Sequence, residues 1–324
     1  MTRELVLGIL LQVTRDGEYS HIALRNVLNK YQYLDKKERA FITRVTEGTL
    51  EHMMVLDYII NQYSKVPTNK MKPVIRNILR SAVYQIKYMD SIPNSAACNE
   101  AVKLTTKKGF TNLRGFVNGV LRNVERNIDS IALPDDLSIR YSMPSWILEQ
   151  WLACYDKEDV ERMLADFHKE KPTTIRVNEN VMNKDVLKNC LESEGVTVTE
   201  HPYLPYALQI SNYDYLADLE SFRQGAFSVQ DISSMLVAHI ANPKHGDYVI
   251  DVCAAPGGKA LHMAELLHQT GHVEARDLTE YKVNFIQENA DRLQLENLWA
   301  EVWDALEFDE SKEEWADVVF CDAP

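Results

Sequence analysis

Apolar residues recur at helical spacing through the first 128 residues. Leu5, Ile9, Leu10 and Val13 share one helical face, and the same spacing returns in each later segment. Asp35 with Glu38 forms a capping box, so a long helix is expected from 36 to about 53. The pattern predicts further helices over 20–28, from 55, and over 74–88, 96–107 and 113–127, with Ser20, Asn94 or Ser95, and Asn112 as candidate caps. We therefore predict an all-α bundle over residues 1–128.

The pattern changes after this bundle. Residues 129–232 begin with a linker and a short helix around Trp146 and Trp151, whose rings are expected in a core. Short strands follow at 173–177, 196–199 and 207–210, with a helix at 185–192 between the first two. This order predicts a small α+β subdomain resembling an RNA-recognition platform, although unrelated α+β subdomains share it.

From residue 233 onward, strands alternate with helices. Strands are expected at 248–252, 273–276, 299–303 and 317–321, with helices at 261–268 and 280–293. Such alternation is typical of a parallel, doubly wound Rossmann-like sheet, here represented by its N-terminal half, residues 233–324. Ligands bind at the carboxyl ends of such strands.

The stretch after the first of these strands has the composition of a cofactor turn. Its residues are mostly small and leave backbone N–H groups at a helix N-terminus open to a ligand; they are Cys253, Ala254, Ala255, Pro256, Gly257, Gly258 and Lys259. A Walker-type loop is excluded because Cys253 and Ala260 stand where Gly and Ser or Thr are needed. The Gly-x-Gly-x-x-Gly fingerprint is also absent. A glycine turn that merely closes a βα unit is the alternative.

Acidic residues follow the later strands. Asp277 is placed to accept both hydroxyls of a ribose, and Asp304 to accept an adenine amino group, because carboxylates only accept hydrogen bonds. Asp322 follows the fourth strand. Together with a turn that has room for a methionine tail, these residues predict an S-adenosylmethionine site; two structural carboxylates are the alternative.

The charge is unevenly distributed along this chain of 324 residues with net charge −13. Residues 61–126 hold twelve Lys or Arg against three Asp or Glu, whereas residues 288–324 hold two against twelve. A nucleic acid would therefore meet the N-terminal half first. The five cysteines lack zinc-site spacing, so no metal is expected. No membrane segment or secretory signal is recognisable, which favours a cytoplasmic protein.

Several segments resemble known families. Residues 34–41, 78–84, 92–96, 99–102 and 116–122 resemble the RNA-binding NusB family. This resemblance makes the following basic residues candidates for phosphate contacts: Arg76, Arg80, Lys107, Lys108, Arg114, Arg122 and Arg126. Residues 253–259 with Asp322-Ala323-Pro324 resemble the RNA cytosine-C5 methyltransferases, in particular the 16S ribosomal RNA enzymes that carry a NusB-like domain. The resemblance implies that the cofactor site is formed by residues 253–259, Asp277, Asp304 and Asp322. It also implies that the partner is 16S ribosomal RNA, with cytosine 967 as the target, and that the protein is a monomer.

The implied mechanism is covalent. A cysteine thiolate adds to carbon 6 of cytosine, carbon 5 takes the methyl group, and Asp322 supports the base near N3. In the family the cysteine that follows Asp-Ala-Pro helps to release the product, and the nucleophile is a second cysteine in a later Thr-Cys motif. We therefore expect both cysteines, and strands five to seven, beyond Pro324. We expect the sequence to be truncated and the 324-residue chain to be inactive. Cys321 is expected inside the fourth strand, among apolar neighbours and on the face opposite Asp322, and Cys253 in packing on the cofactor side, so neither replaces them. The alternatives are a non-catalytic RNA-binding or antitermination-type protein with a remnant methyltransferase domain, and a protein or DNA methyltransferase.

Overall fold

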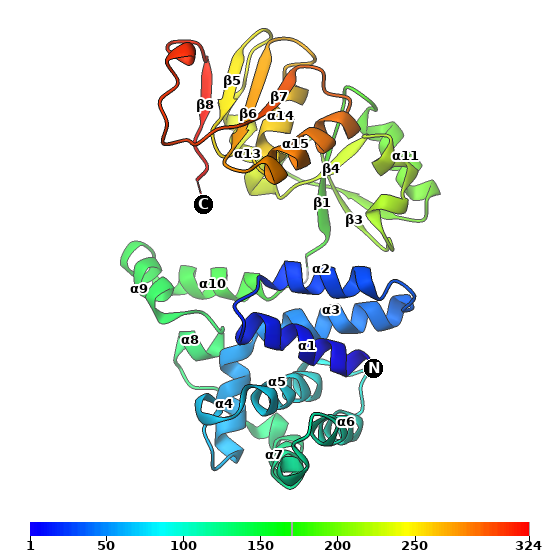
Figure 1. The fold of residues 1–324 in the computed structure, drawn as a ribbon, viewed down its shortest axis with the longest axis vertical. Helices are drawn as coiled ribbons and strands as arrows, with labels where there is room; N and C mark the ends of the chain where they lie inside the picture. Colours follow the sequence, from blue (N-terminus) through cyan, green and yellow to red (C-terminus); the bar gives the residue numbers. More distant parts are fainter. Residues whose placement is uncertain (170, 324) are drawn as a thin grey trace. The chain divides into compact units, whose positions relative to one another are not determined.

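The computed structural model describes residues 1–169 and 171–323, which fall into two compact units, 1–169 and 170–324. The first unit is entirely helical in its described residues (Figure 1). Its α-helices are α1 (Thr2–Thr14), α2 (Ser20–Lys30), α3 (Lys36–Glu51), α4 (Met53–Tyr63), α5 (Pro73–Tyr88), α6 (Asn94–Lys107), α7 (Arg114–Asn127), α8 (Leu137–Arg140), α9 (Ser145–Cys154) and α10 (Lys157–Phe167). The expected all-α bundle is confirmed, and the last three helices extend this unit beyond it.

Helix α5 lies at the centre of this bundle. It contacts α1, α3, α4, α6 and α7, and most of its side chains are buried. Its Tyr84 packs directly against Gly48 of α3, where a Cβ atom would lie 2.1 Å from the Tyr84 ring. The two helices therefore approach as closely as they do only because residue 48 has no side chain.

The capping predictions were correct for one helix and wrong for three. Asp35 accepts a hydrogen bond from the Glu38 backbone N–H at 2.8 Å and caps α3, as expected. The N-cap residues of α2, α6 and α7 are instead Tyr19, Pro93 and Leu113, which make no side-chain cap. In each case the N-cap residue lies one or two positions away from the polar side chain that the local sequence favours.

The aromatic residues of α9 differ from expectation. Trp151 packs against a small core formed by α8, α9 and α10, but Trp146 is 60% exposed. The two rings are five positions apart and therefore point from different sides of the helix, so only one faces the core.

The second unit begins with a four-stranded antiparallel sheet in the order β2-β3-β1-β4. Its elements are β1 (Thr173–Val177), α11 (Lys184–Ser193), β2 (Thr197–Glu200), β3 (Ala207–Ser211), α12 (Glu220–Arg223) and β4 (Phe227–Val229). The three expected strands and the helix between the first two are present. Strand β4 was missed because it has only three residues, too few to show an alternating pattern.

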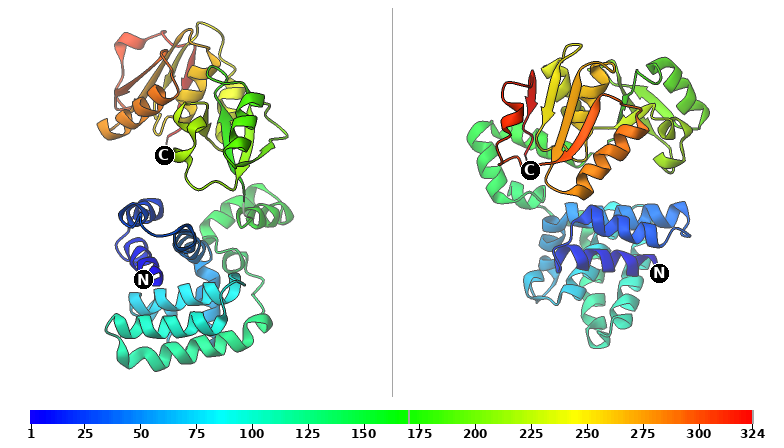
Figure 2. Two further views of the ribbon diagram at one scale, coloured as in Figure 1. Left: turned by 90° about the vertical axis from the view of Figure 1, so that its right-hand side faces the viewer. Right: turned by 45° about the horizontal axis from the view of Figure 1, so that its top comes forward.

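A parallel sheet in the order β7-β6-β5-β8 forms the rest of this unit (Figure 2). It comprises β5 (Tyr248–Asp251), β6 (His272–Asp277), β7 (Leu298–Val302) and β8 (Val318–Phe320), with α13 (Ile232–Ala241), α14 (Gly258–Leu266) and α15 (Glu280–Arg292). Apolar residues of α14 and α15 share one core with the same face of the sheet. The α/β architecture expected from the alternation is confirmed, and β8 lies at one edge. None of the described helices combines the length and apolar character that a bilayer crossing needs.

Candidate functional site at the carboxyl edge of the parallel sheet

The turn between β5 and α14 has the strand, turn and helix order that the sequence predicts. Gly257 is the N-cap residue of α14 and has φ 101°, a left-handed conformation that disfavours other residues. A Cβ atom at this position would lie 3.0 Å from Leu261 Cδ1. The Ala254 N–H donates to the Arg276 carbonyl at 2.8 Å, which ties the turn to β6. The backbone at the start of α14 is thus free of bulky side chains and held in place.

Asp277 is the last residue of β6 and lies beside this turn. Its carboxylate accepts hydrogen bonds from the Ala255 N–H at 3.1 Å, the Leu278 N–H at 2.8 Å and Lys282 Nζ at 2.8 Å. The side chain is almost fully buried. Burial disfavours the charged form, but Lys282 and the two N–H groups outweigh it and hold the pKa of Asp277 below its usual value. Asp277 is therefore an anchored anion next to the turn.

A second carboxylate at this edge, Asp251, was missed as a site residue by the sequence interpretation. It ends β5, is 1% exposed, and accepts a hydrogen bond from the Cys253 N–H at 3.3 Å. Burial, reinforced by the nearby Asp322 and Asp277, raises its pKa to about 6. The signal was available: Asp251 is the only charged residue in an otherwise apolar strand, immediately before the turn.

The end of β8 reaches the same turn. Lys259, in the first turn of α14, forms an ion pair with Asp322. Asp304 lies two residues after β7 and accepts a hydrogen bond from the Leu306 N–H at 2.9 Å, so its described side-chain contact is local. The structure thus joins residues 253–259, Asp277 and Asp322 by contacts, and places Asp304 after a neighbouring strand of the same sheet.

The two cysteines near this edge differ in environment. The pKa of the Cys253 thiol is raised by burial and by neighbouring groups, among them Asp277 and Asp251. This agrees with the expectation that Cys253 is a poor nucleophile. The expectation for Cys321 is wrong: β8 ends at Phe320, so Cys321 lies after the strand and is exposed. The pairing of β8 with β5 also ends at Phe320, which is why the strand is shorter than its apolar run suggested.

The basic candidates of the first unit do not form one uniform set. Arg114 and Arg126 of α7 are exposed, while Lys107 and Lys108 both pair with Glu4, at 2.6 and 2.7 Å. Arg76 is half-buried, and Arg122 donates to Glu125 at 2.7 Å.

Arg80 departs from the expected surface role. It is 7% exposed, and its Nε donates to Asp57 Oδ1 at 2.7 Å in a two-point ion pair. Arg80 is therefore part of a core ion pair rather than a phosphate-contacting side chain, because α5 is surrounded by other helices.

The edge of the parallel sheet combines close backbone approach with negative charge. A tight turn at a helix N-terminus offers close backbone approach, and three carboxylates, Asp251, Asp277 and Asp322, surround it. Among residues 1–169 and 171–323, no cluster of three or more His, Cys, Asp or Glu side chains is arranged to hold a metal ion.

Three protein-family models match the chain. The NusB family matches residues 1–126, the ferredoxin-like domain of the RsmF/B-like methyltransferases matches 143–215, and the 16S rRNA methyltransferase RsmB/F family matches 238–324.

Two relatives match most of the chain. A probable ribosomal RNA small subunit methyltransferase B from Bacillus subtilis (strain 168) is 34% identical, over 99% of this chain and 73% of the relative. A ribosomal RNA small subunit methyltransferase B from Proteus mirabilis (strain HI4320) is 28% identical, over 90% of this chain and 68% of the relative. Among solved structures, the crystal structure of PH0851 matches the whole chain and 73% of its own length, with a TM-score of 0.77 at 23% identity. This last similarity concerns the fold.

Proposed function

The chain belongs to the ribosomal RNA small subunit methyltransferase B family, and from that premise we propose that it serves S-adenosylmethionine-dependent methylation of carbon 5 of a cytosine in 16S ribosomal RNA. Cytosine 967 is the target that the motifs of the RNA cytosine-C5 methyltransferases imply. The observation that carries the proposal is the contact of Asp277 with the turn, through the Ala255 N–H at 3.1 Å.

The residues at this site fit the proposed cofactor. Gly257 and Gly258 leave the start of α14 open, which gives room for the methionine part of the molecule. Asp277 is held ionised and is proposed to accept the ribose hydroxyls, while Asp304 is proposed to accept the adenine amino group. When bound, S-adenosylmethionine supplies an electrophilic methyl group. The buried carboxylate of Asp251 is proposed to compensate for the positive charge of the cofactor's methionine side.

For the acceptor base we propose the covalent route of the cytosine-C5 family. A cysteine thiolate would form a bond to carbon 6 as N3 gains a proton, which makes carbon 5 enamine-like. Carbon 5 would then take the methyl group as the methyl–sulfonium bond breaks and S-adenosylhomocysteine leaves. A base would remove the carbon 5 proton, and the thiolate would leave as the carbon 5–carbon 6 double bond forms again. Asp322 is proposed to support N3 of the base, and its ion pair with Lys259 holds the side chain beside the turn.

None of the five cysteines in the 324 residues follows a threonine, the context of the family's nucleophile, and the raised pKa of Cys253 keeps its thiol protonated. We therefore propose that this chain binds cofactor and RNA without turnover.

In the first unit, exposed basic residues are proposed to contact RNA phosphates. The excess of positive charge over residues 61–126 supports this, and the exposed Arg114 and Arg126 are the leading candidates. Lys107, Lys108, Arg122 and Arg76 are proposed as further contacts.

Calorimetric titration of the 324-residue chain tests the proposal. We expect saturable binding of S-adenosylmethionine and S-adenosylhomocysteine, with ATP and NAD giving no heat of binding. A 16S RNA fragment and labelled S-adenosylmethionine, with a full-length relative as the positive control, test turnover. Absence of cofactor binding together with tight RNA binding would favour the non-catalytic RNA-binding alternative, and methyl transfer by this chain would contradict the proposed inactivity.

A further inference from the structure

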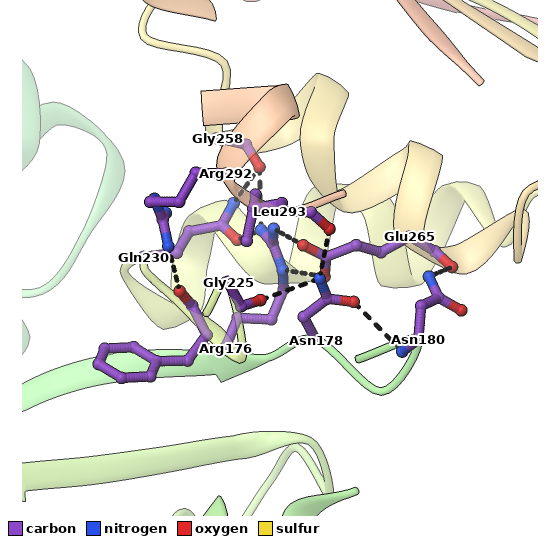
Figure 3. A network of polar contacts seen from close by, with 10 residues as sticks. Arg176, Asn178, Asn180, Gly225, Gln230, Gly258, Glu265, Arg292 and Leu293 are labelled. Atoms are coloured by element: carbon purple, nitrogen blue, oxygen red, sulfur yellow. Dashed lines mark hydrogen bonds and ion pairs between the residues drawn. The ribbon is translucent and has the colours of Figure 1, made fainter. Parts of the chain in front are cut away.

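A partly buried set of polar contacts joins the antiparallel sheet to helix α14 (Figure 3). We call it the α14 clamp and define it as Arg176, Asn180 and Gln230 together with Gly258 and Glu265 of α14. Arg176 in β1 is 1% exposed, and its Nε and Nη2 donate to Glu265 Oε2 and Oε1 at 2.8 and 2.7 Å. Its remaining nitrogen, Nη1, donates to the Gly258 carbonyl at 3.0 Å and also to Gln230. One guanidinium therefore holds two points of the helix.

The other members of the α14 clamp act at the same two points. Gln230, which follows β4, donates from Nε2 to the Gly258 carbonyl at 3.1 Å. Asn180, which follows β1, donates from Nδ2 to the Glu265 carbonyl at 3.0 Å. The first residue of α14 and its last turn are thus both fixed by side chains of the neighbouring subdomain.

The end of α15 is fixed in the same way. Asn178 donates from Nδ2 to the Leu293 carbonyl at 2.9 Å, and Arg292 donates from Nη1 to the Phe222 and Phe227 carbonyls at 3.0 and 3.1 Å. Gly225 permits this approach, because a Cβ atom there would lie 2.0 Å from the Arg292 carbonyl oxygen. The antiparallel sheet therefore positions both helices that follow the strands bearing Asp251 and Asp277.

A purely structural role for Arg176 would not require this arrangement. A buried ion pair is often no better for stability than a well-packed apolar pair, because both charges lose their hydration. An apolar pair would leave the Gly258 carbonyl without the Arg176 hydrogen bond. Gly258 directly follows the N-cap residue of the turn, so this contact, together with that of Gln230, fixes the backbone on which the cofactor is proposed to rest.

We infer that Arg176 is a positioning residue for cofactor binding, which holds the turn at residues 253–258 through the Gly258 carbonyl while Glu265 holds its guanidinium. The inference rests on the proposed function, because the ligand whose affinity is set is S-adenosylmethionine. It makes the antiparallel sheet part of the cofactor site, although no residue of that sheet is proposed to touch the cofactor.

The experiment compares the wild type and four variants of the 324-residue chain by thermal unfolding and by calorimetric titration with S-adenosylhomocysteine, performed well below the lowest Tm. Arg176→Met leaves Glu265 buried and unpaired, so we expect Tm to fall by roughly 10 °C. We also expect affinity to fall about tenfold or more. The double variant R176M/E265M removes the unpaired charge, so Tm should recover while affinity stays low.

Arg80→Met is the matched control. It breaks another ion pair between a buried Arg and a carboxylate, in the other unit of the chain, where Asp57 is 25% exposed. It should lower Tm without changing affinity by more than about twofold. Arg176→Lys should give an intermediate affinity, since a single ammonium cannot reproduce the guanidinium fork.

Hydrogen exchange of the free protein gives a second measurement, independent of any ligand. Amides of residues 253–260 should exchange faster in R176M/E265M than in the wild type, and at wild-type rates in R80M.

If R176M/E265M kept the wild-type affinity for S-adenosylhomocysteine and the wild-type amide exchange rates, the positioning role would be wrong. The proposed function would be unaffected by that result. No binding of S-adenosylhomocysteine by the wild-type chain would instead overturn the proposed function and this inference with it.

Discussion

Lys282 Nζ lies 2.8 Å from Asp277 Oδ1, so the first turn of α15 reaches back to the last residue of β6. The same carboxylate accepts a hydrogen bond from the Ala255 N–H through its other oxygen. Asp277 thus connects the turn, the strand and the following helix. This arrangement keeps the side chain ionised in spite of its burial.

Substitution of Asp277 tests this connection. Asp277→Asn keeps the shape but removes the charge, so we expect S-adenosylhomocysteine affinity to fall about 10- to 100-fold, the value of a charge-assisted hydrogen-bonded pair. Lys282→Met should lower the affinity for S-adenosylhomocysteine by a smaller factor, because the two backbone N–H donors to Asp277 remain. Calorimetry measures both. Equal affinity in D277N and the wild type would remove Asp277 from the cofactor site.

The pH dependence of cofactor binding tests Asp251. Its pKa of about 6 means that the carboxyl group gains a proton, and loses its charge, as the pH falls from 7 to 5. The ionised carboxylate is expected to favour the positively charged S-adenosylmethionine. The affinity for S-adenosylmethionine should therefore fall by up to about tenfold as the pH falls from 7 to 5. Asp251→Asn should bind weakly at both values, with no step near 6. A wild-type profile that is flat between pH 5 and 7 would contradict the assignment.

Exposed arginines on α7 test the RNA proposal. The double variant R114Q/R126Q should bind a 16S RNA fragment more weakly and reduce the slope of log affinity against log salt by about 1.5, since each lost phosphate contact removes roughly 0.7–0.9. Arg162→Gln is the control, an exposed arginine on α10 of the same unit and outside the basic region. Filter binding over a range of salt concentrations measures the slopes. If R162Q lowers the slope as much as the double variant does, the contacts are not specific to α7.

The close approach of α3 and α5 tests the helical core. Gly48→Ala would drive a Cβ atom into the Tyr84 ring, and we expect it to lower the free energy of unfolding by about 1–3 kcal/mol. Gly119→Ala in α7 is the counterpart: nothing lies within 4 Å of its added Cβ, so it should stabilise by about 0.5–1 kcal/mol. Urea denaturation compares the two. If G48A left the free energy of unfolding unchanged, α3 and α5 could move apart without loss of stability, contrary to this prediction.

The sequence alone determined the helical bundle, the alternation of strands and helices after residue 233 and the turn at residues 253–258. These follow from local patterns: apolar spacing selects helix or strand, and small residues around Gly257 permit a left-handed turn at a helix start. The placement of Asp277 at the end of β6 followed in the same way, because parallel strands present their carboxyl ends at one edge.

Only the tertiary structure decided which polar side chains face solvent and which are buried. The sequence predicts Arg80 to be one more basic surface residue, but five other helices surround α5. It also predicts Cys321 to be part of the fourth strand, but the pairing of β8 ends one residue earlier. The contact of Arg176 with Gly258 joins residues 82 positions apart. Long-range pairing of this kind depends on how separate elements pack, and no local spacing encodes it.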